Sequence, residues 1–266
     1  MRQNKLSWVV LPIFVLGCFM MARPCEILAK ELPPHLIQTV TQQDIYEGMA
    51  ALGFLESAIL EEENCEEAYE NVKNCVVRIQ MGNAHGSGVI WDMSGDRMVI
   101  ATNKHVLEYW NSEASYVHFP DNVYTTATVA GISKDYDIGF LEIDCREFAY
   151  EILEQMRYVH WDMKAYEQMQ PEDDVFLVGA VVEGDSEELV SFHRGSIGDM
   201  WQYIEAFEEY MIYGYGQALP GMSGGGTFDA KGNFIGMISG GTTDGETASV
   251  PLPVILEAYA EIEVLD

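Results

Sequence analysis

Short apolar runs separated by glycine, asparagine and aspartate dominate the chain from residue 73 onward. The runs recur at intervals of roughly 8–15 residues, a spacing typical of many short strands. The segments expected to be strands are 75–80, 87–93, 97–102, 124–132, 138–143, 175–182, 233–239 and 248–252. The pattern therefore predicts an all-β barrel or sandwich over this part of the chain.

Helical spacing is confined to the two ends of this β-rich region. Before it, Thr41 or Asp44 could cap a helix whose apolar positions follow at three- and four-residue intervals. These apolar positions are Ile45, Met49, Leu52, Leu55 and Ile59. Six of the ten residues from 61 to 70 are glutamate, which indicates a solvated helix face or an acidic hinge. The apolar spacing of residues 253–262 predicts a short C-terminal helix.

Residues 1–29 have the composition of a targeting segment. Two basic residues precede an apolar run over residues 6–22, as in a secretory signal peptide or, if it is retained, a membrane anchor. The stretch that ends at Cys18 also bears a faint likeness to a lipid-attachment motif. Each alternative places the following domain outside the cytosol. Residues 30–70 are expected to form a linker and an acidic helix.

The charge balance is strongly acidic. Lys and Arg number 14 against 43 Asp and Glu, which gives a formal net charge of −29. Such a chain would repel a polyanion, so a nucleic-acid partner is excluded. The charge favours solubility and could attract cationic substrates. Hydrophobic residues make up 48% of the chain, which is enough for a packed core.

Cysteine usage gives little support for a disulfide framework or a metal site. Cys18 and Cys25 belong to the targeting segment, which leaves Cys65, Cys75 and Cys145. Three cysteines allow at most one bridge, and the sequence does not give its pairing. Buried free thiols are the simplest expectation. No Cys/His spacing suggests zinc, and no metal or organic cofactor is expected.

A single serine lies among four glycines in the stretch GMSGGGTF, residues 221–228. Residues 221–225 match the G-x-S-x-G pattern of α/β-hydrolases. That fold needs a histidine after the serine, and no histidine follows His193. A nucleophilic role for Ser223 therefore requires a base from upstream in the sequence. A flexible glycine loop is the alternative.

One histidine and one aspartate lie next to expected strands. His105 follows the apolar run 97–102, so its ring could project from a strand end into a cleft. The stretch KDYDIGFLEID then offers Asp135, Asp137 and Asp144. Asp137 immediately precedes an apolar strand and could be both partly buried and aimed at an imidazole. Asp135 lies in a polar loop and fits a turn, and purely structural roles remain open for each of these residues.

Three stretches together resemble the signature blocks of trypsin-like serine peptidases: ATNKHVL, YDIGFLEI and GMSGGGTFDAKGNFIGMISGG. They place His105, Asp137 and Ser223 in the order of the chymotrypsin-type triad. The likeness covers roughly residues 71–263 and is greatest to the bacterial HtrA/Deg-like branch. Many members of that branch carry a PDZ domain after the peptidase domain. Too few residues follow Ser223 for one here, so none is expected.

The resemblance implies a fold for residues 71–266. Two six-stranded antiparallel β-barrels would meet with the active site between them, and the boundary between the barrels would fall near residues 150–170. His105 and Asp137 would come from the first barrel and Ser223 from the second. An N-terminal helical extension and the short C-terminal helix would complete the chain.

The resemblance also assigns roles around the nucleophile. The N–H groups of Gly221 and Ser223 would form the oxyanion hole. Gln217 would lie near the base of the S1 pocket, and Ser239, Gly240 and Gly241 would form the edge strand that pairs with an extended polypeptide substrate. Gln217 is not an acid, so a strict preference for Arg or Lys is not supported. Small to medium apolar P1 residues are expected instead.

Met222 departs from the family pattern. Secreted digestive members carry an aspartate there that pairs with a newly cut N-terminus, and many bacterial relatives carry asparagine. An apolar residue at this position argues against activation by N-terminal insertion.

The resemblance implies a serine endopeptidase that forms an acyl-enzyme with polypeptide substrates. The enzyme would be extracytoplasmic, either secreted or anchored at the membrane through the N-terminal segment. Two other functions remain open. A binding protein could retain the fold without turnover, and an esterase could use the same triad. The oligomeric state is not indicated.

Overall fold

The computed structural model describes residues 41, 44–45, 48–49, 55–120, 123–181 and 189–263. The chain divides into two compact units, Met1–Phe54 and Leu55–Asp266. The expected targeting segment, residues 1–29, lies outside the described residues. No helix within the described ranges is both long enough and apolar enough to span a bilayer.

The first unit contains the expected helix start. Residues 44–45 and 48–49 are helical. The Thr41 hydroxyl accepts the Asp44 N–H at 3.1 Å, and the Asp44 carboxylate accepts the Thr41 N–H at 2.7 Å. This reciprocal pair is a capping box, so both proposed capping residues take part.

The second unit begins before the expected domain start at residue 71. Leu55 and Ile59, expected on a helix face, lie in a non-helical stretch, because Leu55 and Ser57 exchange backbone hydrogen bonds with Tyr158. Helix α4, Cys65–Val72, follows and packs against β8, Asp174–Gly179. Its acidic residues face outward, and its buried residues join the core. The acidic stretch is therefore part of the compact unit.

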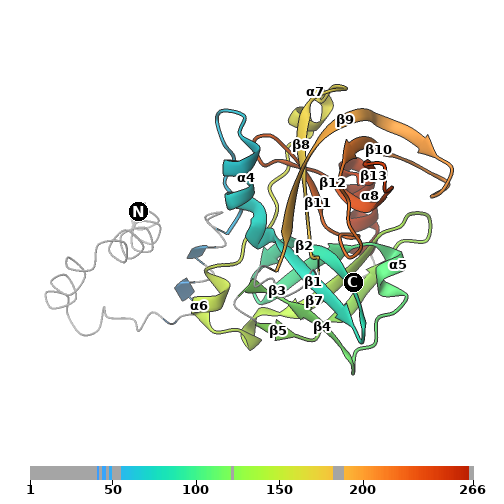
Figure 1. Ribbon diagram of the computed structural model, residues 1–266. Helices are drawn as coiled ribbons and strands as arrows, with labels where there is room; N and C mark the ends of the chain where they lie inside the picture. The colour runs from blue at the N-terminus through green and yellow to red at the C-terminus, as the bar shows by residue number, and fades with distance from the viewer. Residues whose placement is uncertain are drawn as a thin grey trace, which may run out of the picture. The chain divides into compact units, whose positions relative to one another are not determined.

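Seven antiparallel strands form the first sheet, in the order β5-β4-β1-β2-β3-β7-β6 (Figure 1). The strands are β1 Val76–Met81, β2 Ala84–Ser94, β3 Arg97–Thr102, β4 Ser115–His118, β5 Tyr124–Thr125, β6 Thr128–Ile132 and β7 Gly139–Asp144. The expected chymotrypsin-like pair of antiparallel barrels is confirmed, and the first differs from the expectation only in detail. This sheet has a seventh strand and is open between β5 and β6, and so forms a half-barrel.

The second sheet is a closed six-stranded barrel, as expected, in the order β10-β13-β12-β11-β8-β9. Its remaining strands are β9 Ser191–Ile204, β10 Glu209–Gly216, β11 Gly226–Asp229, β12 Phe234–Gly241 and β13 Glu246–Pro251. The connection from the first sheet runs between residues 144 and 174. It contains the short helices η4 Cys145–Glu147, α6 Tyr150–Leu153 and α7 Met163–Gln168.

Helix α8, Leu252–Glu263, contacts both sheets. It packs against β12 and β13 of the barrel and against β6 of the first sheet. Ile262 lies over Gly131 so closely that a Cβ there would be 2.7 Å from the isoleucine side chain. Trp91 of the first sheet packs edge-on against Phe234 of the barrel and Tyr259 of α8, with ring centroids 5.9 Å apart in each pair. The two sheets thus share one core, and residues at their interface are held in fixed positions.

Candidate active site

Ser223 lies directly after a tight turn. The Met222 N–H donates to the Leu219 carbonyl over 3.0 Å to close it. Pro220 precedes Gly221, whose φ of +98° completes the geometry of a type II β-turn. A Cβ at Gly221 would also collide with the His85 ring. Glycine is therefore required at this position.

Met222 holds the turn by packing and not by an ion pair. Its side chain is fully buried among Leu177 of β8 and Ile238 of β12. Its sulfur accepts the Leu219 N–H at 3.2 Å. A Cβ on Gly179 would lie 2.8 Å from the Met222 Cα, so this glycine makes room for the turn.

Most backbone amides around Ser223 are paired. The two amides that follow it donate to the carbonyls of Ile238 and Met222, at 2.8 and 2.9 Å. Within the described part of the chain, no acceptor pairs with the N–H groups of Gly221 and Ser223. Two such donors beside a serine hydroxyl are what a developing oxyanion requires.

Ser87 of β2 fixes the same turn from the other sheet. Its hydroxyl donates to the Gly221 carbonyl at 2.7 Å and accepts the Ala180 N–H at 2.7 Å. Its own N–H donates to the Ser223 carbonyl at 2.7 Å, and its carbonyl accepts the Thr102 hydroxyl at 2.7 Å. Ser87 is fully buried. All of its polar atoms are therefore used, and two of them hold the peptide units beside the unpaired donors.

His105 lies on α5, Lys104–Leu107, a single turn that starts just after β3. Its Nδ1 is 2.8 Å from Asp137 Oδ2, and its backbone N–H donates to Asp137 Oδ1 at 3.0 Å. The Asp137 side chain is 17% exposed and that of His105 is 44% exposed. A shielded carboxylate thus holds one ring nitrogen, which leaves the other for proton transfer.

The structure distinguishes Asp137 from the other two candidate aspartates. Asp135 is exposed in the loop before β7. Asp144 pairs with Arg146, and hydrogen bonds to this arginine lower the pKa of Asp144 to about 2. Only Asp137 among the three contacts an imidazole in the described residues.

Glu209, at the start of β10, was not identified from the sequence. Its carboxylate accepts the Asp137 N–H at 3.2 Å. Burial raises the pKa of Glu209, and the neighbouring Asp137 charge raises it further. This second carboxylate therefore fixes the backbone of Asp137 and adds negative charge beside the Asp137 carboxylate.

A chain of hydrogen bonds joins the serine to the His105 region. Ser223 Oγ donates to the Ser239 carbonyl at 3.1 Å, and the Asn103 amide donates to Ser239 Oγ at 3.0 Å and to the Asp137 carbonyl at 3.1 Å. Asn103 is two residues before His105. No hydrogen bond joins Ser223 Oγ to the His105 ring within the described ranges. The hydroxyl would have to rotate away from Ser239 before it could donate to His105.

The residues expected to bind substrate lie at the C-terminal end of β12 and in the segment beside it. β11 pairs with β12 only as far as Met237, so residues 239–241 have no strand on that side. A Cβ on Gly241 would lie 2.8 Å from the Ala218 Cβ, and one on Gly240 would lie 3.1 Å from Phe207. Gln217 is exposed. An extended peptide could pair with this free edge.

Sequence reasoning missed the residues that support the site from elsewhere in the chain. Ser87 and Glu209 contact the site from distant parts of the chain, and Phe207 and Ala218 lie against its glycines. One available signal was the Gly86–Ser87–Gly88 sequence within an apolar strand. Glycines inside a strand often mark a close approach of another backbone.

Residues 86–237 match the model of a family described as the trypsin-like peptidase domain. No curated protein matches the chain with comparable significance.

Solved structures share the fold. The HtrA-type protease AlgW with tripeptide is 21% identical, with a TM-score of 0.61 over 75% of this chain. An inactive mutant form of Rv3671c from M. tuberculosis H37Rv is 16% identical, with a TM-score of 0.57 over 78% of this chain and 97% of that one. The chain spans 63% of the length of the AlgW structure.

Proposed function

The chain belongs to the family of trypsin-like peptidase domains, and on this premise we propose that it is a serine endopeptidase that uses His105, Asp137 and Ser223. One observation carries the proposal: among the described residues, the N–H groups of Gly221 and Ser223 have no protein acceptor, and they lie beside the only hydroxyl of this turn. The His105–Asp137 pair supplies the base on the facing sheet.

The mechanism begins with rotation of the Ser223 hydroxyl from Ser239 towards His105. The imidazole Nε2 takes the hydroxyl proton as Oγ forms a bond to the substrate carbonyl carbon. The Gly221 and Ser223 N–H groups donate to the resulting oxyanion. The Asp137 carboxylate accepts a hydrogen bond from the Nδ1–H group and so stabilises the imidazolium without taking its proton.

Collapse of the tetrahedral intermediate breaks the peptide C–N bond. The imidazolium gives its proton to the departing amine, which leaves the acyl group on Ser223. A water molecule then attacks the ester, with His105 as the base, and releases the acid product. No step calls on a metal ion or an organic cofactor.

Polypeptides are the proposed substrates. AlgW has been solved with a tripeptide and with a decapeptide, and the free edge of residues 239–241 would suit an extended chain. The partly buried Ala218 and Leu219 pack beside Met222, which favours small apolar P1 side chains. An extracytoplasmic location, with secretion or membrane attachment through residues 1–29, follows from the pattern of that segment alone.

Hydrolysis of unfolded casein by the purified chain tests the proposal. We expect turnover to fall by ~10³-fold or more in Ser223→Ala and His105→Ala, since triad members act as a unit. Both variants should retain the circular dichroism spectrum of the parent. Cleavage of p-nitrophenyl acetate without any peptide cleavage would identify an esterase instead. A folded protein that cleaves neither substrate would be a silent binding protein.

A further inference from the structure

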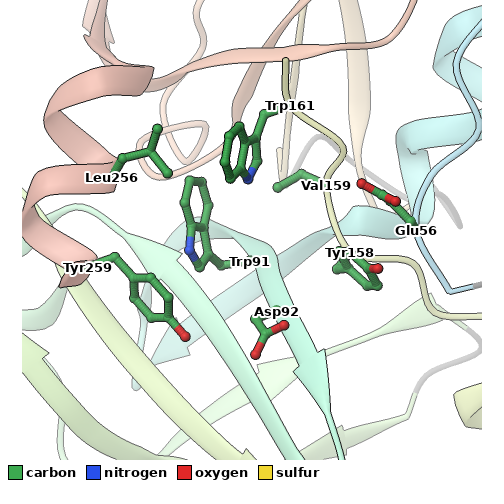
Figure 2. Close-up of a pocket in the computed structure, with 8 residues that line it drawn as sticks. All are labelled: Glu56, Trp91, Asp92, Tyr158, Val159, Trp161, Leu256 and Tyr259. Atoms are coloured by element: carbon green, nitrogen blue, oxygen red, sulfur yellow. The ribbon is translucent and has the colours of Figure 1, made fainter. Parts of the chain in front are cut away.

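A cavity of about 490 Å³ lies away from the proposed catalytic residues (Figure 2). Its walls come from β2, from the connection between the sheets, from α8 and from the start of the second unit. The lining residues are Glu56, Trp91, Asp92, Tyr158, Val159, Trp161, Leu256 and Tyr259. None of them contributes to the catalytic mechanism.

A β-bulge shapes one wall. The pairing of β2 with β3 shifts register between Ile90 and Asp92, which leaves Trp91 as the extra residue. Bulges re-aim side chains, and Figure 2 shows Trp91 and Asp92 both bordering the cavity. The Ile90 carbonyl accepts the Val159 N–H at 2.9 Å and so ties the opposite wall to the bulge.

Four of the eight lining residues are aromatic. Figure 2 shows the Trp161 indole above that of Trp91, with Tyr158 and Tyr259 on opposite sides. Trp91 is 5% exposed and belongs to the core, whereas Trp161 is 39% exposed. The Trp161 indole is therefore accessible to a ligand that enters the cavity, whereas Trp91 lies at its base.

The charge in the cavity is negative. Glu56 and Asp92 are its carboxylic acids, and no lysine or arginine of the described residues lines it. The pKa of Tyr158 is raised first by burial and then by the charges of Glu56 and Asp92, so both carboxylates act on the phenol.

The neighbouring cations do not cancel this charge. Within the described residues, Glu56 uses one oxygen to bind His160 at 2.7 Å, and Asp92 uses one to accept the Ser94 hydroxyl at 2.9 Å. Arg97, which lies beside Tyr259, is paired with Glu142 at 2.6 Å. Each cavity carboxylate therefore keeps an oxygen for a ligand.

We propose that this cavity is a binding site for a methylated ammonium group. Aromatic faces attract cations, and recognition of quaternary ammonium ions by aromatic walls is a known use of this effect. A primary ammonium is compact and strongly hydrated, whereas a methylated one loses less hydration against indole and phenol rings. The two carboxylates supply the counter-charge, and the net charge of −29 concentrates cations around the protein.

Titration of the full chain with choline tests the site. Binding is monitored through the ¹H–¹⁵N resonances of the tryptophan indoles. We expect saturable shifts of the Trp91 and Trp161 signals, while Trp201 on the distant hairpin stays constant. The neutral isostere 3,3-dimethyl-1-butanol should bind at least tenfold more weakly. Equal affinity for the two compounds, or no saturable shift with choline, would overturn the proposal.

Three variants tie the binding to these residues. Asp92→Asn should weaken choline binding about tenfold and leave the neutral isostere unaffected. Trp161→Ala, at a partly exposed position that folding tolerates, should abolish the saturable response. Glu113→Gln removes one charge from an exposed acid elsewhere and serves as the matched control. An equal loss of choline affinity in this control would mean that choline responds only to the net charge of the protein, and it would overturn the proposal.

Binding to phosphatidylcholine vesicles shows whether the methylated ammonium belongs to a lipid headgroup or to a free small molecule. Co-sedimentation that choline competes away would identify a lipid headgroup as the ligand. Choline binding without vesicle binding would identify a free small molecule.

Discussion

Ser87 lies on the first sheet, yet it holds the backbone of the second barrel at the proposed nucleophile. Its side chain reaches Gly221 across 134 positions of sequence. The catalytic turn is therefore shaped by the interface between the sheets as well as by its own glycines. Loss of the Ser87 hydroxyl would remove one of the two hydrogen bonds that hold the Gly221–Met222 peptide and leave the Ala180 N–H without its Ser87 acceptor.

Ser87→Ala should lower kcat for peptide hydrolysis by about 10-fold to 10²-fold, with KM nearly unchanged. The reason is that a shifted oxyanion donor weakens the transition state more than the bound substrate. Thr227→Val is the matched control, because the buried Thr227 hydroxyl bonds the Ser249 hydroxyl at 2.8 Å, within the barrel. A comparable loss of kcat in this control would show that Ser87 acts through general stability.

The pairing of His105 with Asp137 could be predicted from the sequence, because each residue lies at the end of an apolar run that fixes its position locally. The glycine-rich turn could be predicted for the same reason. Ser87 and Glu209 could not be predicted, because their contacts join segments 134 and 72 positions apart. The orientation of the Ser223 hydroxyl towards Ser239 is likewise a property of the folded site alone.

Strand β8 and the catalytic turn pack closely against each other. Gly179 at the end of β8 leaves the space that the Met222 backbone occupies, and Leu177 covers the Met222 side chain. A charged residue in place of Met222 would have no partner among the described groups around it. The turn therefore depends on an apolar anchor at this position.

Met222→Asp should destabilise the protein by about 3 kcal/mol or more, because an unpaired carboxylate would be buried. Met222→Leu conserves volume and should cost less than about 1.5 kcal/mol. Urea unfolding of the two variants measures the difference. Equal stability of the aspartate and leucine variants would mean that this side chain is not enclosed in solution.

Burial accounts for only some of the strands that the sequence pattern predicted, because β6 was predicted without any buried residue and the fully buried β11 was not predicted. β3 is buried at five of its six positions, and its apolar run was recognised. In β9 only Ile197 is buried, so the alternation that marks a strand is missing. Backbone pairing and exposed aromatic contacts hold this hairpin instead, such as the stack of Trp201 on Tyr210 at 5.8 Å. Such strands leave little trace in a hydropathy pattern.

The stability of the whole second unit depends on the side chains buried between its sheets. This stability should therefore fall at alkaline pH, because Cys75 is one of the buried residues. Burial raises the pKa of this thiol to about 12, against roughly 8.5 in an unfolded chain. Above the unfolded value, the unfolded chain releases the proton and the folded chain keeps it. The stability contributed by the neutral thiol is therefore lost as pH rises from about 8.5 towards 12.

Comparison with Cys75→Ala isolates this effect from other groups that titrate in the same range. The wild-type chain should be the more stable of the two at pH 7, because alanine leaves a cavity. The difference in unfolding free energy should shrink by about 2 kcal/mol between pH 8 and pH 10.5. A difference that stays constant with pH would indicate that Cys75 is not enclosed. Cys65, Cys75 and Cys145 are all free thiols in the structure. The substitution of Cys75 therefore breaks no disulfide bond among them.

The arrangement of two sheets around one site is tested most directly by a fluorophosphonate probe with intact-mass and peptide-mass readout. The account predicts one probe molecule per chain, attached to Ser223, and no labelling after His105→Ala. A folded chain that stays unlabelled, or one labelled at another residue, would contradict it.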